Sequence, residues 1–240
     1  MKMSDSVALK KMNFMPAATG WISDLTDPSL YFMTYSLKAQ AIFDMNAFLN
    51  QLQQRNSSPA NRLAEPAPDD QQIAEILRCA VAAPDHARLR PWRFIVIRGK
   101  ARIALGNVFA EIARSKDPDS TEDNLQRLRE KPLRAPLIIT VVTRLTSGHP
   151  KTPEVEQILS TGAAAQQLLL GANALGFGAV WLTGSNAYDP RVKSALSLDS
   201  NEDIAGFIYI GTESGATNGT PTITKARPEI ANHLSEWHGT

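Results

Sequence analysis

Apolar residues recur at intervals of three and four along much of the chain, the spacing that predicts amphipathic helices. This pattern predicts helices over residues 46–54, 70–83, 101–113, 154–175 and 191–196. Asp69 or Asp70 is a candidate cap for the second helix, because a short acidic side chain accepts hydrogen bonds from the free amides of a first turn. That helix should end by residue 83, since Pro84 disfavours a helical conformation in the residue before it.

Short, nearly continuous apolar runs predict buried strands between these helices. They cover residues 94–97, 137–143, 178–182 and 204–210. The highly charged stretch 116–131 is typical of a surface loop with room for a solvated helix, and the tail from residue 211 is rich in Gly, Thr and Pro. Four apolar strands mixed with helices indicate an α+β or α/β layered domain, and the irregular order of the connections argues against a simple doubly wound sheet.

The composition argues against several classes of protein. Of the 240 residues, 43% are hydrophobic and 20% are charged, as in a folded globular protein and unlike a disordered one. A net charge of +1 leaves no basic excess for nucleic acid, and a single cysteine, Cys79, excludes an internal disulfide framework. Gln, Asn and Gly residues interrupt the most apolar long stretch, residues 163–182, so we expect no membrane span. The single cysteine fits a reducing compartment, and we expect a cytoplasmic location.

A change in composition near residue 45 predicts a domain boundary. All six methionines lie in residues 1–45, and these residues contain no Arg and no Glu. We therefore expect an N-terminal extension over residues 1–44 and one domain over residues 45–240. Two explanations stay open: a native arm that packs on the domain, or a chain start placed too early, in which case the extension is disordered or not native.

Sequence motifs for most catalytic chemistries are absent. No glycine-rich stretch ends in Gly-Lys-Ser/Thr, no G-x-S-x-G elbow occurs, and the four histidines show no HExxH spacing. The glycines at 171, 176 and 178 follow the order helix, glycine, strand, whereas a dinucleotide fingerprint needs strand, glycines, helix. We therefore expect neither a metal site nor a catalytic acid–base pair.

Four sequence segments, in order and with matching spacing, carry a resemblance to a known family. They are APDH at 83–86 followed by LRPWRF at 89–94, RLAEPAP at 62–68, RAPLII at 134–139 and GFGAVW at 176–181. Over about residues 45–212 the chain resembles the nitroreductase family, and more narrowly its small NAD(P)H nitroreductases that bind FMN. The resemblance implies an α+β sandwich with a central, mostly antiparallel sheet flanked by helices, and a homodimer that binds two FMN molecules at the subunit interface.

The resemblance also implies where FMN binds. Arg55, Asn56 and Ser57 match the family's Arg-x-Ser stretch that holds the FMN phosphate, although the second residue of that stretch is often Arg. His86 matches a position that reaches the flavin bound mainly by the other subunit. Close relatives place an FMN-contacting Arg where this chain has Ala82. The residues alone leave plainer explanations open, namely a solvated helix end at 55–57 and a local turn at His86.

Two further stretches match cofactor-binding positions of the family. Trp181, Leu182 and Thr183 match the strand end that lines the flavin ring. A stretch assigned to NAD(P) in relatives is matched by Gly171, Ala172, Asn173, Ala174, Leu175 and Gly176. Core packing of the tryptophan and helix packing of the glycine stretch are the alternatives. The stretch 225–227 resembles a phosphate-binding Lys-x-Arg of the wider family's tail, which narrower relatives often lack, so it is not counted with the site.

These matches imply an FMN-dependent oxidoreductase of the NAD(P)H nitroreductase type. Hydride would pass from NAD(P)H through the flavin to a small electron-poor acceptor such as a nitroaromatic or a quinone, in a ping-pong sequence. No catalytic side chain is expected, because the flavin carries the chemistry. Two alternatives stay open: a flavin-binding protein without turnover that stores or senses FMN, and a structural protein that has lost FMN.

Overall fold

The computed structural model describes residues 47–214 and 226–239, and contacts along the chain divide it into two units, residues 1–49 and 50–240. All of the strands described lie in the second unit. The expected extension over residues 1–44 lies outside the described residues, so its two explanations remain open. Residues 47–54 form a helix, as the sequence predicts for 46–54.

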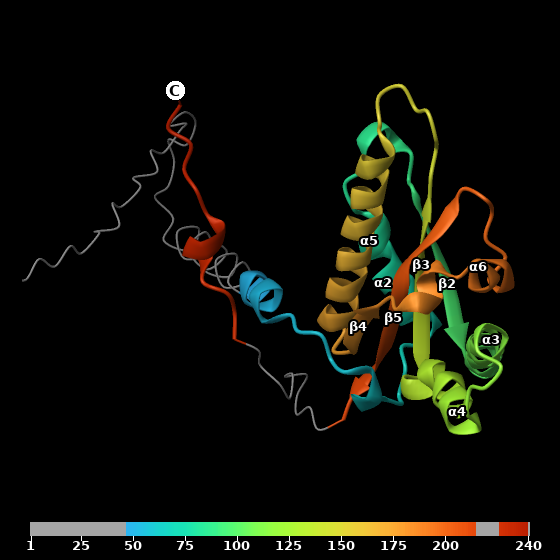
Figure 1. Ribbon diagram of the computed structural model, residues 1–240. Coiled ribbons are helices and arrows are strands. Elements are labelled where there is room, and N and C mark those ends of the chain that lie inside the picture. Colours follow the sequence, from blue (N-terminus) through green and yellow to red (C-terminus); the bar gives the residue numbers. More distant parts are fainter. Residues whose placement is uncertain (1–46, 215–225, 240) are drawn as a thin grey trace, which may run out of the picture. The chain divides into compact units, whose positions relative to one another are not determined.

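In the described part of the second unit, five antiparallel strands form the central sheet (Figure 1). They are β1 (Leu63–Ala64), β2 (Trp92–Arg98), β3 (Leu137–Arg144), β4 (Gly178–Leu182) and β5 (Glu202–Glu213). β5 pairs with β1, β3 and β4, whereas β2 pairs with β3 alone. The sequence predicts β4 with its observed bounds. It misses β1, and it ends the last strand at residue 210, whereas β5 continues through Gly211 to pair with β1.

Helices cover both faces of this sheet. They are α2 (Asp70–Val81), α3 (Lys100–Lys116), α4 (Glu122–Glu130), α5 (Glu154–Ala174) and α6 (Pro190–Ala195). Asp69 caps α2, because its side chain accepts a hydrogen bond from the Gln72 amide while the Gln72 side chain accepts one from the Asp69 amide. α4 lies in the charged stretch 116–131, where the sequence predicts a surface loop with room for a solvated helix, and its Leu125 is fully buried. Within the described ranges, no helix combines the length and apolarity needed to cross a bilayer.

Two apolar cores separate the layers of the fold. α2 and α5 pack on one sheet face, while α3, α4 and α6 lie over the other (Figure 1). The first core includes Ile76, Leu168, Ile139, Ile208 and Ile210. The second includes Phe109, Leu105, Ile138, Phe207 and Val192. Alternation of side chains along β3 and β5 assigns neighbouring residues to opposite cores. The expected α+β sandwich around a mostly antiparallel sheet is confirmed, and the simple doubly wound sheet is absent from the described residues.

A buried carboxylate joins three segments at one end of the sheet. Glu202, at the start of β5, is fully buried and accepts hydrogen bonds from Arg93 of β2 at 2.6 and 2.9 Å. It also accepts bonds from Arg144 of β3 at 3.0 Å and from the Asp199 amide at 3.1 Å. These bonds stabilise the charged form and lower the pKa of Glu202 to about 2 from its ordinary value of 4.5, mainly through Arg93. The cluster therefore ties β2, β3 and β5 together as an ionised group.

Replacing Glu202 by glutamine should lower the free energy of unfolding at pH 7 by about 2 kcal/mol, because two arginines lose their buried partner. A carboxylate with a lowered pKa stabilises the fold above its unfolded pKa and loses that contribution as pH falls through the folded pKa. The gap between wild type and Glu202→Gln should therefore close between pH 4.5 and about 2 in urea unfolding. Glu122→Gln, at an exposed glutamate that also pairs with two arginines, is the matched control and should stay near wild type. An equal loss in both variants would contradict a special role for Glu202.

Candidate functional site

The segment of residues 55–58 docks at the beginning of β4. The Ser58 amide donates to the Ala179 carbonyl at 3.0 Å, and the Ser58 hydroxyl donates to Oε2 of Glu213 at 2.7 Å. Both Ser58 and Glu213 are buried. A side chain at Gly178 would come within 2.8 Å of the Ser58 hydroxyl, so the glycine makes room for this segment. The predicted phosphate-binding residues are therefore held next to β4 by the residue that follows them.

Two arginines meet at this segment. Arg227 donates from Nη2 to the Arg55 carbonyl at 2.7 Å, and burial together with the charge of Arg227 lowers the pKa of Arg55. Arg55 Nη1 lies 3.5 Å from the Ser57 hydroxyl, while Nδ2 of the Asn56 side chain donates to the Gln54 carbonyl at 2.8 Å. Neither arginine is in an ion pair among the described residues. Two neighbouring cations without a carboxylate make a site suited to an anion.

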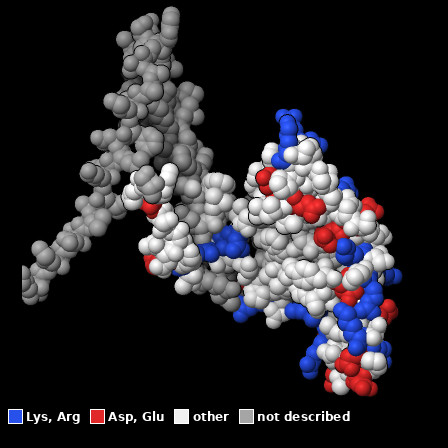
Figure 2. Space-filling view, turned by 45° about the horizontal axis from the view of Figure 1, so that its top comes forward, with Lys and Arg blue, Asp and Glu red and all other residues white. Residues whose placement is uncertain are grey.

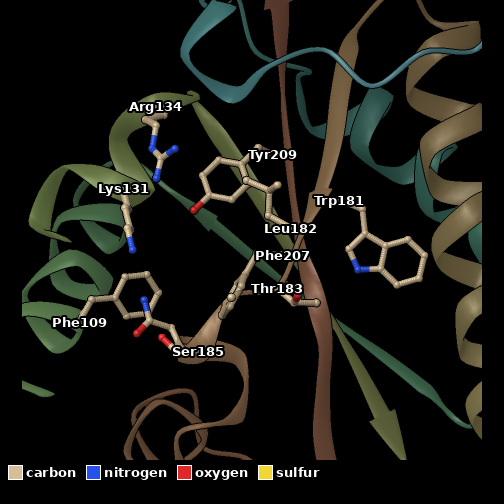
Figure 3. Close-up of a pocket in the computed structure, with 11 residues that line it drawn as sticks. Phe109, Lys131, Arg134, Trp181, Leu182, Thr183, Ser185, Phe207 and Tyr209 are labelled. Atoms are coloured by element: carbon tan, nitrogen blue, oxygen red, sulfur yellow. The ribbon is translucent and has the colours of Figure 1, made fainter. Parts of the chain in front are cut away.

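A pocket of about 380 Å³ opens at the other end of β4 (Figure 3). Its lining is Phe109, Lys131, Arg134, Trp181, Leu182, Thr183, Gly184, Ser185, Asn186, Phe207 and Tyr209. The pocket thus contains the three residues predicted to line the flavin ring. Figure 3 shows that Lys131, Arg134 and the Tyr209 hydroxyl lie on one side of β4. Burial raises the pKa of Tyr209, which the charge of Arg134 opposes, so the hydroxyl remains a neutral donor at pH 7.

Trp181 lies in β4 opposite Ile208 of the neighbouring strand β5. Its Nε1 donates to the Ala205 carbonyl at 3.1 Å, and its ring packs against the core formed with α2 and α5. Gly206 lies directly beneath the indole, which leaves no room for a Cβ atom at that position. The indole therefore points away from Lys131 and Arg134 (Figure 3). At the pocket, Trp181 therefore serves mainly to pack the end of β4 against the core. Leu182 and Thr183 come next along the chain, toward the opening of the pocket.

The stretch predicted to contact NAD(P) lies at the end of α5. Gly171 and Ala172 are buried, and a Cβ atom at Gly171 would lie 3.1 Å from Cβ of Cys79. Gly176 ends the helix with a φ of 84°, a conformation that glycine adopts without strain. Packing of α2 on α5 therefore accounts for the first two residues. Ala174, Leu175 and Gly176 are exposed, and together with Asn173 they keep the NAD(P) role as a prediction.

His86 lies at the opposite end of α5 from the Arg55 segment. Its Nδ1 atom is 2.6 Å from Oε2 of Glu156, which is in the first turn of α5. Both residues line a hollow of about 270 Å³ together with Pro84, Asp85, Leu159, Ser160 and Ala163. The 21 residues of α5 span about 31 Å, and β4 with its docked segment begins just past the C-terminal end of that helix (Figure 1). Within one chain, His86 and the Arg55 segment are therefore separated by most of the length of α5.

Charges on the viewed face of the molecule are mixed rather than gathered into one field. Figure 2 shows Lys and Arg side chains interspersed with Asp and Glu over that face. Within residues 47–214 and 226–239, no group of three or more His, Cys, Asp or Glu side chains is placed to hold a metal ion.

The family model described as "Nitroreductase family" matches residues 57–212, more than half of the chain. The chain belongs to the nitroreductase family. A relative in Escherichia coli (strain K12), "Putative NAD(P)H nitroreductase YdjA", is 40% identical over 157 residues, which are 65% of this chain and 84% of that protein. The matched range of the family model includes β1 to β5 up to residue 212 and the pocket at the end of β4.

Solved structures of family members share the fold. A nitroreductase-like protein from Bacillus cereus is 26% identical with a TM-score of 0.64, and the match covers 80% of this chain and 96% of that one. A Desulfovibrio desulfuricans protein, described as "a putative nitroreductase in complex with fmn", is 27% identical with a TM-score of 0.58, and the match covers 80% of this chain and 97% of that one.

Two cations of the pocket were absent from the sequence prediction. Lys131 and Arg134 belong to the short 3₁₀ helix η3 (Lys131–Arg134), which leads from α4 into β3. The sequence shows two basic residues three positions apart in front of a buried strand, but this spacing is common on surfaces. Their significance comes from the tertiary contact that brings η3 beside the end of β4, which no local pattern reveals.

Proposed function

We propose that this nitroreductase-family protein is an FMN-dependent oxidoreductase that uses NAD(P)H to reduce a small electron-poor acceptor. The observation that carries the proposal is the placement of positive charge at both ends of β4. Arg55 and Arg227 lie at its beginning, and Lys131 and Arg134 border the pocket at its end. The five residues of β4 span about 16 Å, so a single elongated anionic ligand could meet both pairs of cations.

The donor set at the beginning of β4 fits a phosphate. Arginine presents several N–H donors in a planar fork that matches phosphate oxygens, and the Ser57 hydroxyl adds a further donor. In this chain Arg55, Ser57 and Arg227 would hold the FMN phosphate. Asn56 adds no cation where many relatives have an arginine, so the charge of Arg227 compensates from the tail.

The pocket at the end of β4 fits the flavin ring. Leu182 and Thr183 would lie along the ring, while Lys131 and Arg134 supply positive charge on one side of it. When bound, FMN supplies the redox chemistry, because its ring accepts a hydride from NAD(P)H, carries negative charge and passes the hydride on to an acceptor. The two cations favour that negative charge electrostatically, and this is the main contribution of the protein's side chains.

We further propose that the protein is a homodimer, because the placement of His86 calls for a site shared by two chains. His86 and the Arg55 segment lie at opposite ends of α5, so one FMN touched by both must receive them from two chains. The first turns of α5 also expose Val155, Ile158 and Leu159, with exposed fractions of 60%, 51% and 67%. Three large apolar side chains on one helix face beside the His86 hollow suit a subunit interface. Each FMN site would then include residues of both subunits.

The purified protein, loaded with FMN, should show a flavin absorbance band that bleaches anaerobically on addition of NADH or NADPH. The band should return when a quinone or a nitroaromatic is added, because the same flavin serves both halves of the reaction. A band that persists with both nicotinamides would overturn the proposed activity and leave a flavin-binding protein without turnover. A protein that does not bind FMN at all would instead favour the structural alternative, in which the chain keeps the fold of the family and has lost FMN.

Arg55→Ala should raise the FMN dissociation constant by about 10- to 100-fold, because it removes charge-assisted bonds to the phosphate. The effect should shrink for riboflavin, which lacks the phosphate, and titration by flavin fluorescence measures both. Arg114→Ala is the control, since Arg114 is an exposed cation paired with Glu122 away from β4. Equal FMN affinity in Arg55→Ala and wild type would contradict the placement of the phosphate.

Multi-angle light scattering should give the mass of a dimer, twice the 26.2 kDa of the chain. Ile158→Glu should shift this mass toward that of a monomer, because it places a charge in the proposed interface. Ile103, exposed on α3, provides the control Ile103→Glu, which should remain dimeric. A wild-type protein that binds FMN as a monomer would contradict the proposal that each FMN site includes residues of two subunits.

A further inference from the structure

The loop that carries His86 has a strained backbone. Between α2 and β2, Ala87, Arg88 and Arg90 have φ values of 62°, 57° and 51°. Residues with a side chain seldom adopt this left-handed region, because Cβ approaches the neighbouring carbonyl. Three such residues within four positions persist only where surrounding contacts impose the conformation. The contacts that hold the loop in this conformation therefore identify the residues that determine its structure.

Four hydrogen bonds hold the loop, and two of them come from α5. Near its base, the Arg90 amide donates to Oδ2 of Asp85 at 2.6 Å. The Pro91 carbonyl accepts bonds from the Thr161 hydroxyl at 2.7 Å and from the Arg144 amide at 2.9 Å. The fourth bond joins the His86 ring to Glu156 at 2.6 Å. Thr161 and Glu156 lie five residues apart on α5, so this helix fixes both the base of the loop and its histidine.

The bond to Glu156 also selects the tautomer of His86. A carboxylate 2.6 Å from Nδ1 requires the proton to be on that nitrogen. Nε2 is then the ring atom left available to a ligand. His86 and Glu156 keep 55% and 42% of their side-chain surface exposed and share the hollow of about 270 Å³. The histidine is thus oriented before any ligand arrives, while its second nitrogen remains accessible.

We propose that Glu156 is a positioning residue for flavin binding, which holds His86 in the Nδ1-protonated tautomer so that Nε2 contacts the flavin bound mainly by the partner subunit. This inference rests on the proposed function. Glu156 itself makes no contact with the cofactor and acts through the histidine. Because the orienting group is a hydrogen-bond acceptor, an uncharged acceptor of the same shape should replace it.

Two variants of Glu156 test this role. Glu156→Ala should raise the FMN dissociation constant about tenfold, the effect expected for one lost hydrogen bond that orients a ligand group. Glu156→Gln should restore most of the affinity, because its amide oxygen still accepts from Nδ1. Glu154→Ala is the matched control, since Glu154 lies in the same turn and, among the described residues, its side chain bonds only to the Ser147 hydroxyl. Affinity that is equal in wild type and Glu156→Ala, or equally lost in Glu156→Gln, would overturn the proposal.

A spectroscopic measurement on the protein without flavin separates this inference from the proposed function. Long-range ¹H–¹⁵N NMR of the histidine side chains should show His86 protonated on Nδ1 in wild type and Glu156→Gln, and shifted toward the Nε2-protonated form in Glu156→Ala. A histidine that keeps its tautomer in Glu156→Ala would overturn the role of Glu156. If wild type shows the expected tautomer and binds no FMN, the proposed function fails instead.

His86→Asn isolates the second nitrogen of the ring. The asparagine amide occupies the position of Nδ1 and keeps the donor to Glu156, but it has no atom in place of Nε2. FMN affinity in His86→Asn should fall about as far as in Glu156→Ala. Combining the two substitutions should add little further loss, because both remove the same contact. Additive losses would overturn the proposal that Glu156 acts through His86.

Discussion

Strand β5 is the constraint on which the rest of this structure depends. It is the strand to which β1, β3 and β4 are all hydrogen bonded, and its two ends carry the buried carboxylates Glu202 and Glu213. The first joins β5 to the arginines of β2 and β3, and the second receives Ser58 from the segment before β1. One strand therefore determines the position of β4 and, through its last residue, the position of Arg55.

The charged groups in this fold serve two different purposes. The arginines around Glu202 are matched by a carboxylate and stabilise the sheet. The cations beside β4 lack such partners among the described residues, and their mutual repulsion at Arg55 and Arg227 is unfavourable until an anion is present. Uncompensated charge is therefore concentrated at the site proposed for FMN, at a cost in stability that a bound anion would remove.

The sequence predicts the parts of the fold that local patterns determine. β4 is predicted with its observed bounds, because an apolar run lies between a helix-ending glycine and a polar loop. The extension of β5 is missed because Gly211 looks like a strand breaker, yet the ring of Pro136 and the carbonyl of Ala64 approach too closely for any side chain there. The charged stretch 116–131 leaves room for a solvated helix but does not give the bounds of α4, since only Leu125 of that helix is fully buried.

The candidate site also contains some residues that the sequence predicts and others that it does not. Arg55, Ser57, His86 and the end of β4 were predicted through the resemblance to the family, because their sequence segments are recognisable without a structure. Lys131 and Arg134 depend on how η3 meets β4, and Glu156 depends on a contact across 70 residues of sequence. Such residues become visible only when the chain is folded. The predicted roles at 171–176 are the least specific, because α2 packing already requires a small residue at Gly171.

The contact between Trp181 and Gly206 also has a consequence for how this protein can diverge. The indole occupies the space that any side chain at residue 206 would need, so residues 181 and 206 cannot both have large side chains. A large residue can appear at 206 only after the aromatic ring at 181 has been lost. Across descendants of this chain the two positions should therefore vary together, and the order of the two substitutions should be fixed, with the change at 181 coming first.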